Sequence, residues 1–268
     1  MIQRQVRSHV IGSFAAAALA RSTGAWRVLA TFPTATYLTD GTDTVVLTAR
    51  DVAPGPIHVT TGSDLVAVDP RDEMVVTADR LVIGAHTIDI SETPQWLGSL
   101  PAASDLLTVR ETLGPALDRV AGTSALAAEP FAARARSAFD AAGRRGPDAM
   151  AELLIGLGPG LTPAGDDALA GFLIVSIAMG RIVPGSWRMH RTLARRTNAM
   201  SRAYIQCAAE GQAIAHVHHV LLGAARGDRA ARDAACHALA GVGGTSGADI
   251  AFGMSAGLSI RTDLARTH

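Results

Sequence analysis

The residues best suited to chemistry lie in one short segment, where a run of glycines leads into two adjacent carboxylates. Residues 156–167 read GLGPGLTPAGDD. Glycines permit positive φ angles, and Pro163 suits the first position of a helix that has Thr162 as its N-cap. A helix N-terminus offers free N–H groups and a partial positive charge, which favour a bound anion. The residues expected to hold that anion are Gly158, Gly160, Thr162 and Gly165.

A tight, well-capped turn between two helices is the alternative interpretation of this segment. That interpretation does not account for Asp166 and Asp167, which precede an almost wholly apolar helix predicted over 163–179. Neighbouring helix positions lie about 100° apart, so at most one of the two carboxylates faces solvent. Because a buried carboxylate needs partners, we interpret both aspartates as functional.

A second segment repeats the pattern about 80 residues later. Gly165-x-Asp167-xxx-Gly171 matches Gly247-x-Asp249-xxx-Gly253. Chance similarity is a real alternative in a chain with 27 glycines. Two positive helix ends repel unless something negative lies between them, and both apolar helices must enter one core. We therefore expect the two loops to lie side by side around one pocket. The second loop is expected to contribute Thr245, Ser246, Gly247 and Asp249.

Hydroxyl groups are expected on the wall of the same pocket. Thr197 and Ser201 are four residues apart in a helix predicted over 187–210, so their side chains share a face. The nearby Arg195, Arg196 and Arg202 are interpreted as a solvated helix face.

Composition excludes several classes of function. All 24 Lys and Arg residues are arginine, which excludes a Schiff-base lysine, hence pyridoxal phosphate chemistry, and a Walker-type phosphate loop. The formal net charge of zero argues against a nucleic-acid or anionic-membrane surface. Cys207 and Cys236 cannot make a disulfide framework or a Cys-x-x-Cys metal site.

No targeting or membrane segment is expected. The stretch Val10–Ala20 follows two arginines as in a signal peptide, but it is mostly alanine and is interrupted by Gly12 and Ser13. An amphipathic first helix is the preferred interpretation. The apolar run 168–179 is shorter than the ~20 residues of a membrane span. We therefore expect a cytoplasmic protein.

The elements that must position these residues fall into two classes. Before residue 100 the chain is rich in short Val/Ile/Thr runs separated by turn signals, which is typical of strands. Strands are expected over 26–31, 44–49, 57–61, 65–68, 74–77, 81–83 and 86–90. From Ser104, which is predicted to be an N-cap, apolar residues recur at helical spacing. The pair Gly114-Pro115 is a candidate break in this first helix. Helices are expected over 131–142, 147–155, 163–179, 187–210, 212–225, 229–240 and from about 248.

The predicted fold class is therefore α+β. A small antiparallel β barrel or sandwich with a leading helix is expected over residues 1–100. An all-helical domain carrying both glycine-rich motifs is expected over residues 101–268.

The motif residues resemble a known family. Gly158 to Asp167, followed by Leu169-Ala170-Gly171, is similar to the signature of the AllH-like family, formerly a domain of unknown function. Thr197-xxx-Ser201, Gly211 and Thr245-Ser246-Gly247-x-Asp249 also fit, as do Gly55-Pro56 and Trp96 upstream. The resemblance extends over nearly the whole chain.

This resemblance implies a subunit of oxamate carbamoyltransferase in bacterial allantoin catabolism, working with other subunits. The enzyme interconverts carbamoyl phosphate plus oxamate with oxalurate plus phosphate. Thr162, Thr245 and Ser246 would hold substrate oxygens, and the three aspartates would either accept hydrogen bonds from amide nitrogens or hold Mg²⁺. The alternatives are a non-catalytic effector-binding or assembly subunit and a stand-alone metal-assisted hydrolase.

Overall fold

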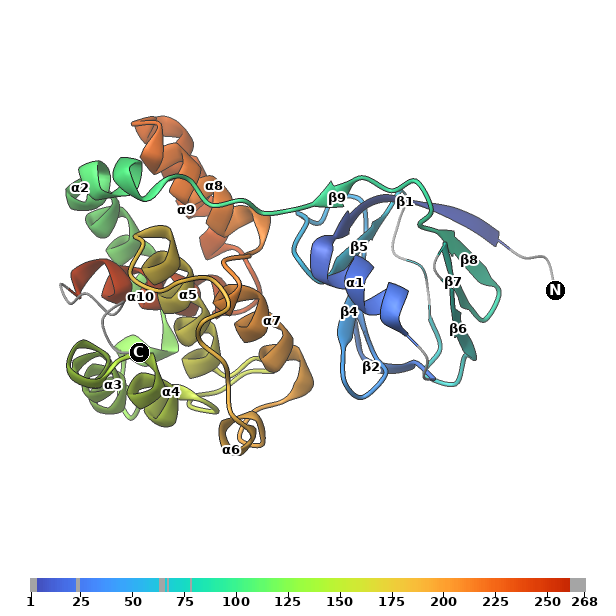
Figure 1. Ribbon diagram of the computed structural model, residues 1–268, viewed down its shortest axis with the longest axis horizontal. Helices are drawn as coiled ribbons and strands as arrows, with labels where there is room; N and C mark the ends of the chain where they lie inside the picture. Colours follow the sequence, from blue (N-terminus) through green and yellow to red (C-terminus); the bar gives the residue numbers. More distant parts are fainter. Residues whose placement is uncertain (1–3, 23–24, 63–65, 67, 78, 261–268) are drawn as a thin grey trace. The chain divides into compact units, whose positions relative to one another are not determined.

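The computed structural model describes residues 4–22, 25–62, 66, 68–77 and 79–260 of the 268-residue chain. The chain divides into two compact units, residues 1–98 and residues 99–268. The first unit is built on strands and the second is helical (Figure 1). The α+β fold class predicted from the change in hydrophobic period is confirmed.

The first unit is one curved sheet that forms a near-barrel. Its strands are β1 (Arg4–Gly12), β2 (Arg27–Phe32), β3 (Ala35–Thr39), β4 (Thr44–Thr48), β5 (His58–Thr61), β6 (Met74–Val76), β7 (Arg80–Ile83), β8 (His86–Asp89) and β9 (Gln95–Trp96). They follow the order β2-β3-β4-β5-β1-β8-β7-β6, and β9 pairs with β1. β1, β3 and β9 were not predicted. The strand expected over 65–68 is not seen in its described residues, Val66 and Val68; Leu65 and Ala67 lie outside the description.

The sheet is mixed, which corrects the expectation of a purely antiparallel one. β1 pairs in parallel with β8 and with β9, and β4 pairs in parallel with β5. The hydrophobic pattern predicts where strands lie, but it does not determine which strands pair or in which direction. A tight hairpin forces antiparallel pairing, whereas the loop 49–57 carries the chain back to the start of β4 before β5 begins.

The leading helix begins later than expected, because Val10–Gly12 are the end of β1. Val10 and Ile11 are β-branched and suit a strand. A Cβ on Gly12 would lie 2.1 Å from the Pro56 carbonyl oxygen, so the backbones touch there. Helix α1 (Ser13–Arg21) follows, and it packs against β4 through a buried face of Ala15, Ala18 and Leu19.

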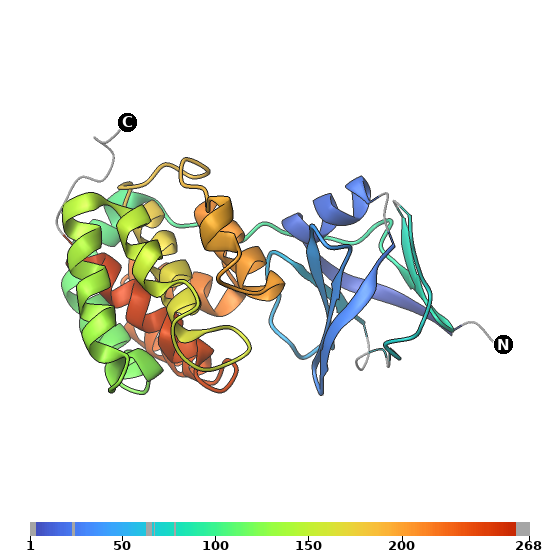
Figure 2. The same ribbon diagram turned by 90° about the horizontal axis from the view of Figure 1, so that it is seen from below.

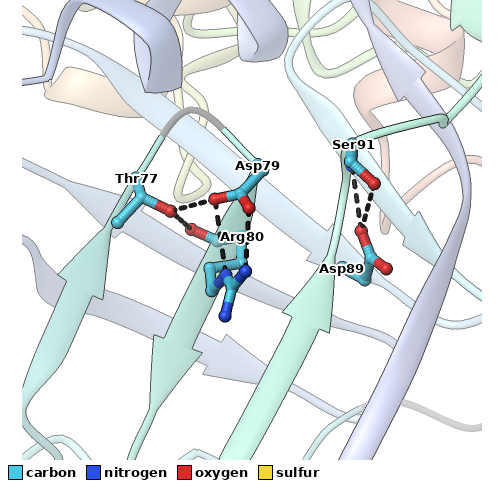
Figure 3. Close-up of polar contacts among 5 residues, drawn as sticks. All are labelled: Thr77, Asp79, Arg80, Asp89 and Ser91. Carbon is cyan, nitrogen blue, oxygen red and sulfur yellow. Dashed lines mark hydrogen bonds and ion pairs between the residues drawn. The ribbon is translucent and has the colours of Figure 1, made fainter.

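Polar contacts at the β6–β7–β8 end of this sheet stabilise turns (Figure 3). The exposed Asp79 pairs with Arg80 at 2.9 Å and accepts a hydrogen bond from Thr77. The hydrogen bond from Arg80 is the main cause that lowers the Asp79 pKa to about 2. Ser91 likewise lowers the pKa of Asp89. These groups are exposed and mutually satisfied, so we assign them no further role.

The second unit is a helical bundle with α5 near its centre (Figure 2). Its helices are α2 (Ala103–Ala121), η1 (Ala125–Ala127, a 3₁₀ turn), α3 (Ala132–Arg145), α4 (Pro147–Leu154), α5 (Ala164–Ala178), α6 (Arg191–Ala194), α7 (Ala199–Ala209), α8 (Ala215–Ala225), α9 (Arg229–Ala240) and α10 (Ser246–Ser259). Every residue of α5 except Ala170 is buried, as its apolar sequence predicted. Its most extensive helix contact is with α10. None of the helices that the structure describes combines the length and the apolar character of a membrane crossing.

Several predicted helix boundaries are wrong for local reasons. α2 has Ala102 rather than Ser104 as its N-cap, and it runs through Pro115. Pro115 is exposed, so water can replace the backbone hydrogen bond that proline removes. The helix expected over 187–210 is broken into α6 and α7, because the Asn198 side chain accepts a hydrogen bond from Ser201 N–H and caps a new helix.

Candidate functional site

The two glycine-rich loops lie next to each other, as predicted. Thr162 belongs to the loop between α4 and α5, and Ser246 is the first residue of α10. Their hydroxyl oxygens are 3.0 Å apart. The Thr162 hydroxyl also donates to Asp167 Oδ2 at 2.8 Å. Because that hydroxyl has one proton, Ser246 is the donor in its contact with Thr162. Thr162 therefore links the two loops.

The predicted sequence repeat is also a structural repeat. Gly165 N–H donates to the Leu157 carbonyl at 2.8 Å, and Gly247 N–H donates to the Val242 carbonyl at 3.0 Å. A Cβ at Gly165 would lie 2.1 Å from the Leu154 oxygen, and one at Gly247 would lie 1.7 Å from the Leu239 oxygen. In both cases the start of the second helix is pressed against the end of the first. Only glycine permits so close an approach.

The helices that follow the two loops cross each other symmetrically. A Cβ at Gly171 would lie 2.1 Å from the Ile250 carbonyl oxygen, and one at Gly253 would lie 1.8 Å from the Ala168 carbonyl oxygen. Each glycine comes four residues after its aspartate, and each carbonyl comes one residue after the other aspartate. The crossing therefore brings the N-terminal turns of α5 and α10 together and holds Asp167 and Asp249 within range of each other's charge.

Asp166 is buried, and protein groups already bind both of its carboxylate oxygens. Oδ1 accepts a hydrogen bond from Gly156 N–H at 2.8 Å, and Oδ2 accepts one from the Thr197 hydroxyl. Burial raises its pKa, while Thr197, Gly156, Ser201 and the charge of Arg196 oppose that rise. Thr197 precedes the Asn198 cap of α7, so Thr197 and Ser201 do not share a helix face as expected. Thr197 bonds Asp166 instead, and the nearby Ser201 hydroxyl is buried without a hydrogen-bond partner among the described residues.

The pKa of Asp167 is strongly raised. Its exposed fraction is 6%. Burial raises its pKa to about 8, and the charges of Asp249 and Asp166 add to the effect, whereas Thr162 and Ser246 oppose it. Its proton is therefore mostly retained at neutral pH, because the ordinary pKa of an aspartate is about 3.9.

Asp249 is held from a part of the chain that the sequence analysis did not connect to the site. Its Oδ1 accepts hydrogen bonds from the Ser124 hydroxyl at 2.6 Å and from Ala125 N–H at 3.0 Å. Ser124 is the N-cap of η1 and also accepts from Leu126 N–H. Asp249 is 1% exposed, and its Oδ2 has no hydrogen-bond partner among the described residues.

The remaining predicted residues play smaller parts. Thr162 does not cap α5, because Pro163 is the N-cap and the Thr162 hydroxyl turns to Asp167. Thr245 is exposed, and its carbonyl accepts from Asp249 N–H. Gly158 and Gly160 have φ angles of 92° and 108°, which shape the loop.

Ser124 and Asn198 were missed by the sequence analysis, and Gly156 and Arg196 were named there without a role in the site. The Asn198 side-chain amide donates to the Leu161 carbonyl and so ties the loop to α7. The Arg196 guanidinium, expected to be solvated, donates to the Glu152 and Ile155 carbonyls at 2.7 and 3.0 Å, at the end of α4. An Asn-x-x-Ser capping pattern could have located Asn198. No local signal links Ser124 to Asp249.

Ser124→Ala is expected to destabilise the helical unit by about 1–3 kcal/mol, because it removes a donor from a buried carboxylate. Urea unfolding measures this loss. Ser137→Ala is the matched control, since Ser137 is exposed on α3 and bonds only its own helix. Equal stability of the two variants would show that Ser124 does not hold Asp249.

The geometry gives little support to a magnesium site. Within the described part of the chain, no three His, Cys, Asp or Glu side chains form a group that could hold a metal ion. Both oxygens of Asp166 are taken by protein donors, and Asp249 Oδ1 is taken twice.

Comparison with known proteins supports the resemblance in the region of the site. Residues 154–258 match the family model described as oxamate carbamoyltransferase subunit AllH. No curated protein and no solved structure matches the chain. The match covers both loops and all three aspartates, but it leaves out Ser124, Trp96 and Gly55-Pro56 and is shorter than the nearly full-length resemblance expected. Residues 154–258, the part that carries the two loops, are therefore similar to the AllH family.

Proposed function

We propose that this chain is a subunit of an oxamate carbamoyltransferase, or of a closely related carbamoyl-transfer complex, in the cytoplasm. The observation that carries the proposal is the junction of α5 and α10, where Thr162, Ser246 and three buried aspartates come together inside the region that matches the family. The substrates are carbamoyl phosphate and a small anionic acceptor such as oxamate, and the pathway is allantoin catabolism.

Carbamoyl transfer requires that the two substrates be held in position, and it needs no covalent nucleophile from the protein. The acceptor nitrogen attacks the carbamoyl carbon, the bond from that carbon to the phosphate oxygen breaks, and the nitrogen passes a proton to the departing phosphate. Fixed backbone N–H groups of the glycine-rich loops stabilise charge on the carbonyl oxygen, while the Thr162 and Ser246 hydroxyls hold the two loops and Asp167 in place. Asp249 accepts a hydrogen bond from an amide nitrogen, whereas Asp166, with both oxygens occupied, positions Thr197 and the loop.

The test is reconstitution with the partner subunits. We expect the isolated chain to fold and to show little transfer between carbamoyl phosphate and oxamate, and we expect activity when the partner subunits are present. Asp249→Asn in the assembled complex should lower turnover by about 100-fold or more. Asp105→Asn, on an exposed first-turn aspartate of α2, is the control and should leave turnover unchanged.

Other outcomes point to the alternatives. Full activity of the isolated chain would contradict the dependence on partners. A complex that is active with Asp249→Asn but fails to assemble without this chain would indicate a non-catalytic assembly subunit. Metal-dependent hydrolysis by the chain alone would indicate a hydrolase.

A further inference from the structure

Asp249 Oδ2 is a buried acceptor atom that a ligand could bond. It belongs to a side chain that is 1% exposed, and it has no hydrogen-bond partner among the described residues. The other oxygen of the same carboxylate is bound twice, by Ser124 and Ala125. A buried acceptor without a donor is costly, by about 1–3 kcal/mol. A ligand that brings an N–H group would remove this cost.

The neighbouring side chain of Asp167 can supply a hydrogen-bond donor beside the acceptor of Asp249. Asp167 Oδ2 contacts the Thr162 hydroxyl, so a retained proton placed on Oδ1 would make that oxygen a donor. The charged groups that act on Asp167 are Asp249 from α10 and Asp166 from its own helix, while Arg196, from the segment after α6, acts on Asp166. With the proton on Oδ1, the pair offers one O–H donor and, at Asp249 Oδ2, one acceptor without a partner among the described residues.

This pattern of donor and acceptor selects a particular chemical group. A planar carboxamide has a carbonyl oxygen that accepts and an N–H that donates, so it matches the pair. A carboxylate or a phosphate would place its charge beside Asp166 and Asp249, which already occupy the positive ends of α5 and α10. The anion first expected at these helix ends is therefore disfavoured there.

We propose that Asp167 and Asp249 form a subsite for a carboxamide or carbamoyl group, in which Asp167 donates to the carbonyl oxygen and Asp249 Oδ2 accepts from the nitrogen. The inference rests on the proposed function and deepens it, because it names the end of the acceptor that lies at the aspartate pair. For oxamate, the carboxamide lies at the aspartate pair and the carboxylate points away from it.

Oxamate and oxalate are the matched probes, since they differ only by a carboxamide in place of a carboxylate. Calorimetric titration of the full chain and of the assembled complex at pH 7 is expected to give at least about tenfold tighter binding of oxamate, equivalent to about 1.4 kcal/mol. Above about pH 8, oxamate affinity should fall by about tenfold per pH unit as Asp167 loses its proton.

Substitutions at Asp167 separate recognition from charge. Asp167→Asn keeps one donor and one acceptor, so it should retain the preference for oxamate and lose the pH dependence. Asp167→Ala removes both groups and should bring oxamate to within about twofold of oxalate. Asp105→Ala is the control and should behave as the wild type. Thermal unfolding of each variant verifies that the binding protein is folded.

The outcomes distinguish this inference from the proposed function. Oxalate binding as tightly as oxamate, absence of binding by both probes, or loss of the preference in Asp167→Asn would each overturn the subsite. A complex that transfers carbamoyl groups while showing no preference would leave the proposed function standing without this subsite. A preference for oxamate without any carbamoyl transfer would support the subsite and contradict the proposed function.

Discussion

Asp167→Asn is expected to make the protein more stable at neutral and alkaline pH and to flatten part of its pH dependence. The folded-state pKa of Asp167 is raised to about 8 by burial, whereas an unfolded aspartate titrates near about 3.9. Between these values the folded state holds a proton that the unfolded state has released. The free energy of unfolding therefore falls as pH rises, by up to about 1.4 kcal/mol per pH unit for this one group.

The direction of the effect follows from that proton. The stability linked to Asp167 protonation is fully present below about pH 4 and is lost as pH rises through about 8. Asparagine has no such proton to lose. Wild type and variant should therefore be similar near pH 4 and should differ by a few kcal/mol near pH 8, in favour of the variant. The raised pKa of Asp166 leaves some slope in both proteins.

Urea unfolding at several pH values between 4 and 9 measures this difference. Asp105→Asn, in the exposed first turn of α2, is the matched control and should retain the wild-type slope. Parallel curves for wild type and Asp167→Asn would contradict the retained proton. Unfolding of Asp167→Asn at all pH values would show that the carboxyl is a structural cap of α5.

Gly253→Ala is expected to cause a large loss of stability. The added Cβ would lie 1.8 Å from the Ala168 carbonyl oxygen, and the atoms it meets are backbone atoms that cannot rotate away. α5 and α10 must then separate along their most extensive contact. We expect a cost of about 3 kcal/mol, at the upper end of the range for overpacked cores.

The same separation should disable the site, because Thr162 and Ser246 are joined across this crossing. Chemical unfolding measures the cost, and titration with oxamate measures the site. Gly143→Ala is the control, since a Cβ there meets nothing within 4 Å inside α3. Alanine favours a helix interior over glycine, so the control should gain about 0.5–1 kcal/mol. Equal stability of Gly253→Ala and wild type would contradict the close crossing.

Sequence alone determined the features that depend on local pattern. The period of the apolar residues separated a strand-rich half from a helical half, and it located α9 at its observed bounds. The run of apolar residues after Asp167 predicted the buried helix α5. The repeated Gly-x-Asp-xxx-Gly pattern predicted the junction of the two loops, because its glycines allow close backbone approach and the apolar helices that follow must enter one core.

The tertiary structure decided what depends on contacts between distant segments. The direction of strand pairing was one such feature, since β1 pairs in parallel with β8 and β9, which come last in the sequence of its unit. The role of Thr162 was another, because its hydroxyl bonds Asp167 and Ser246 rather than capping α5. Ser124 reaches Asp249 from the segment between α2 and α3, and no spacing rule relates residues so far apart. Burial, which raises the pKa of Asp167, is likewise a property of the packed helices and not of the residues beside it in the chain.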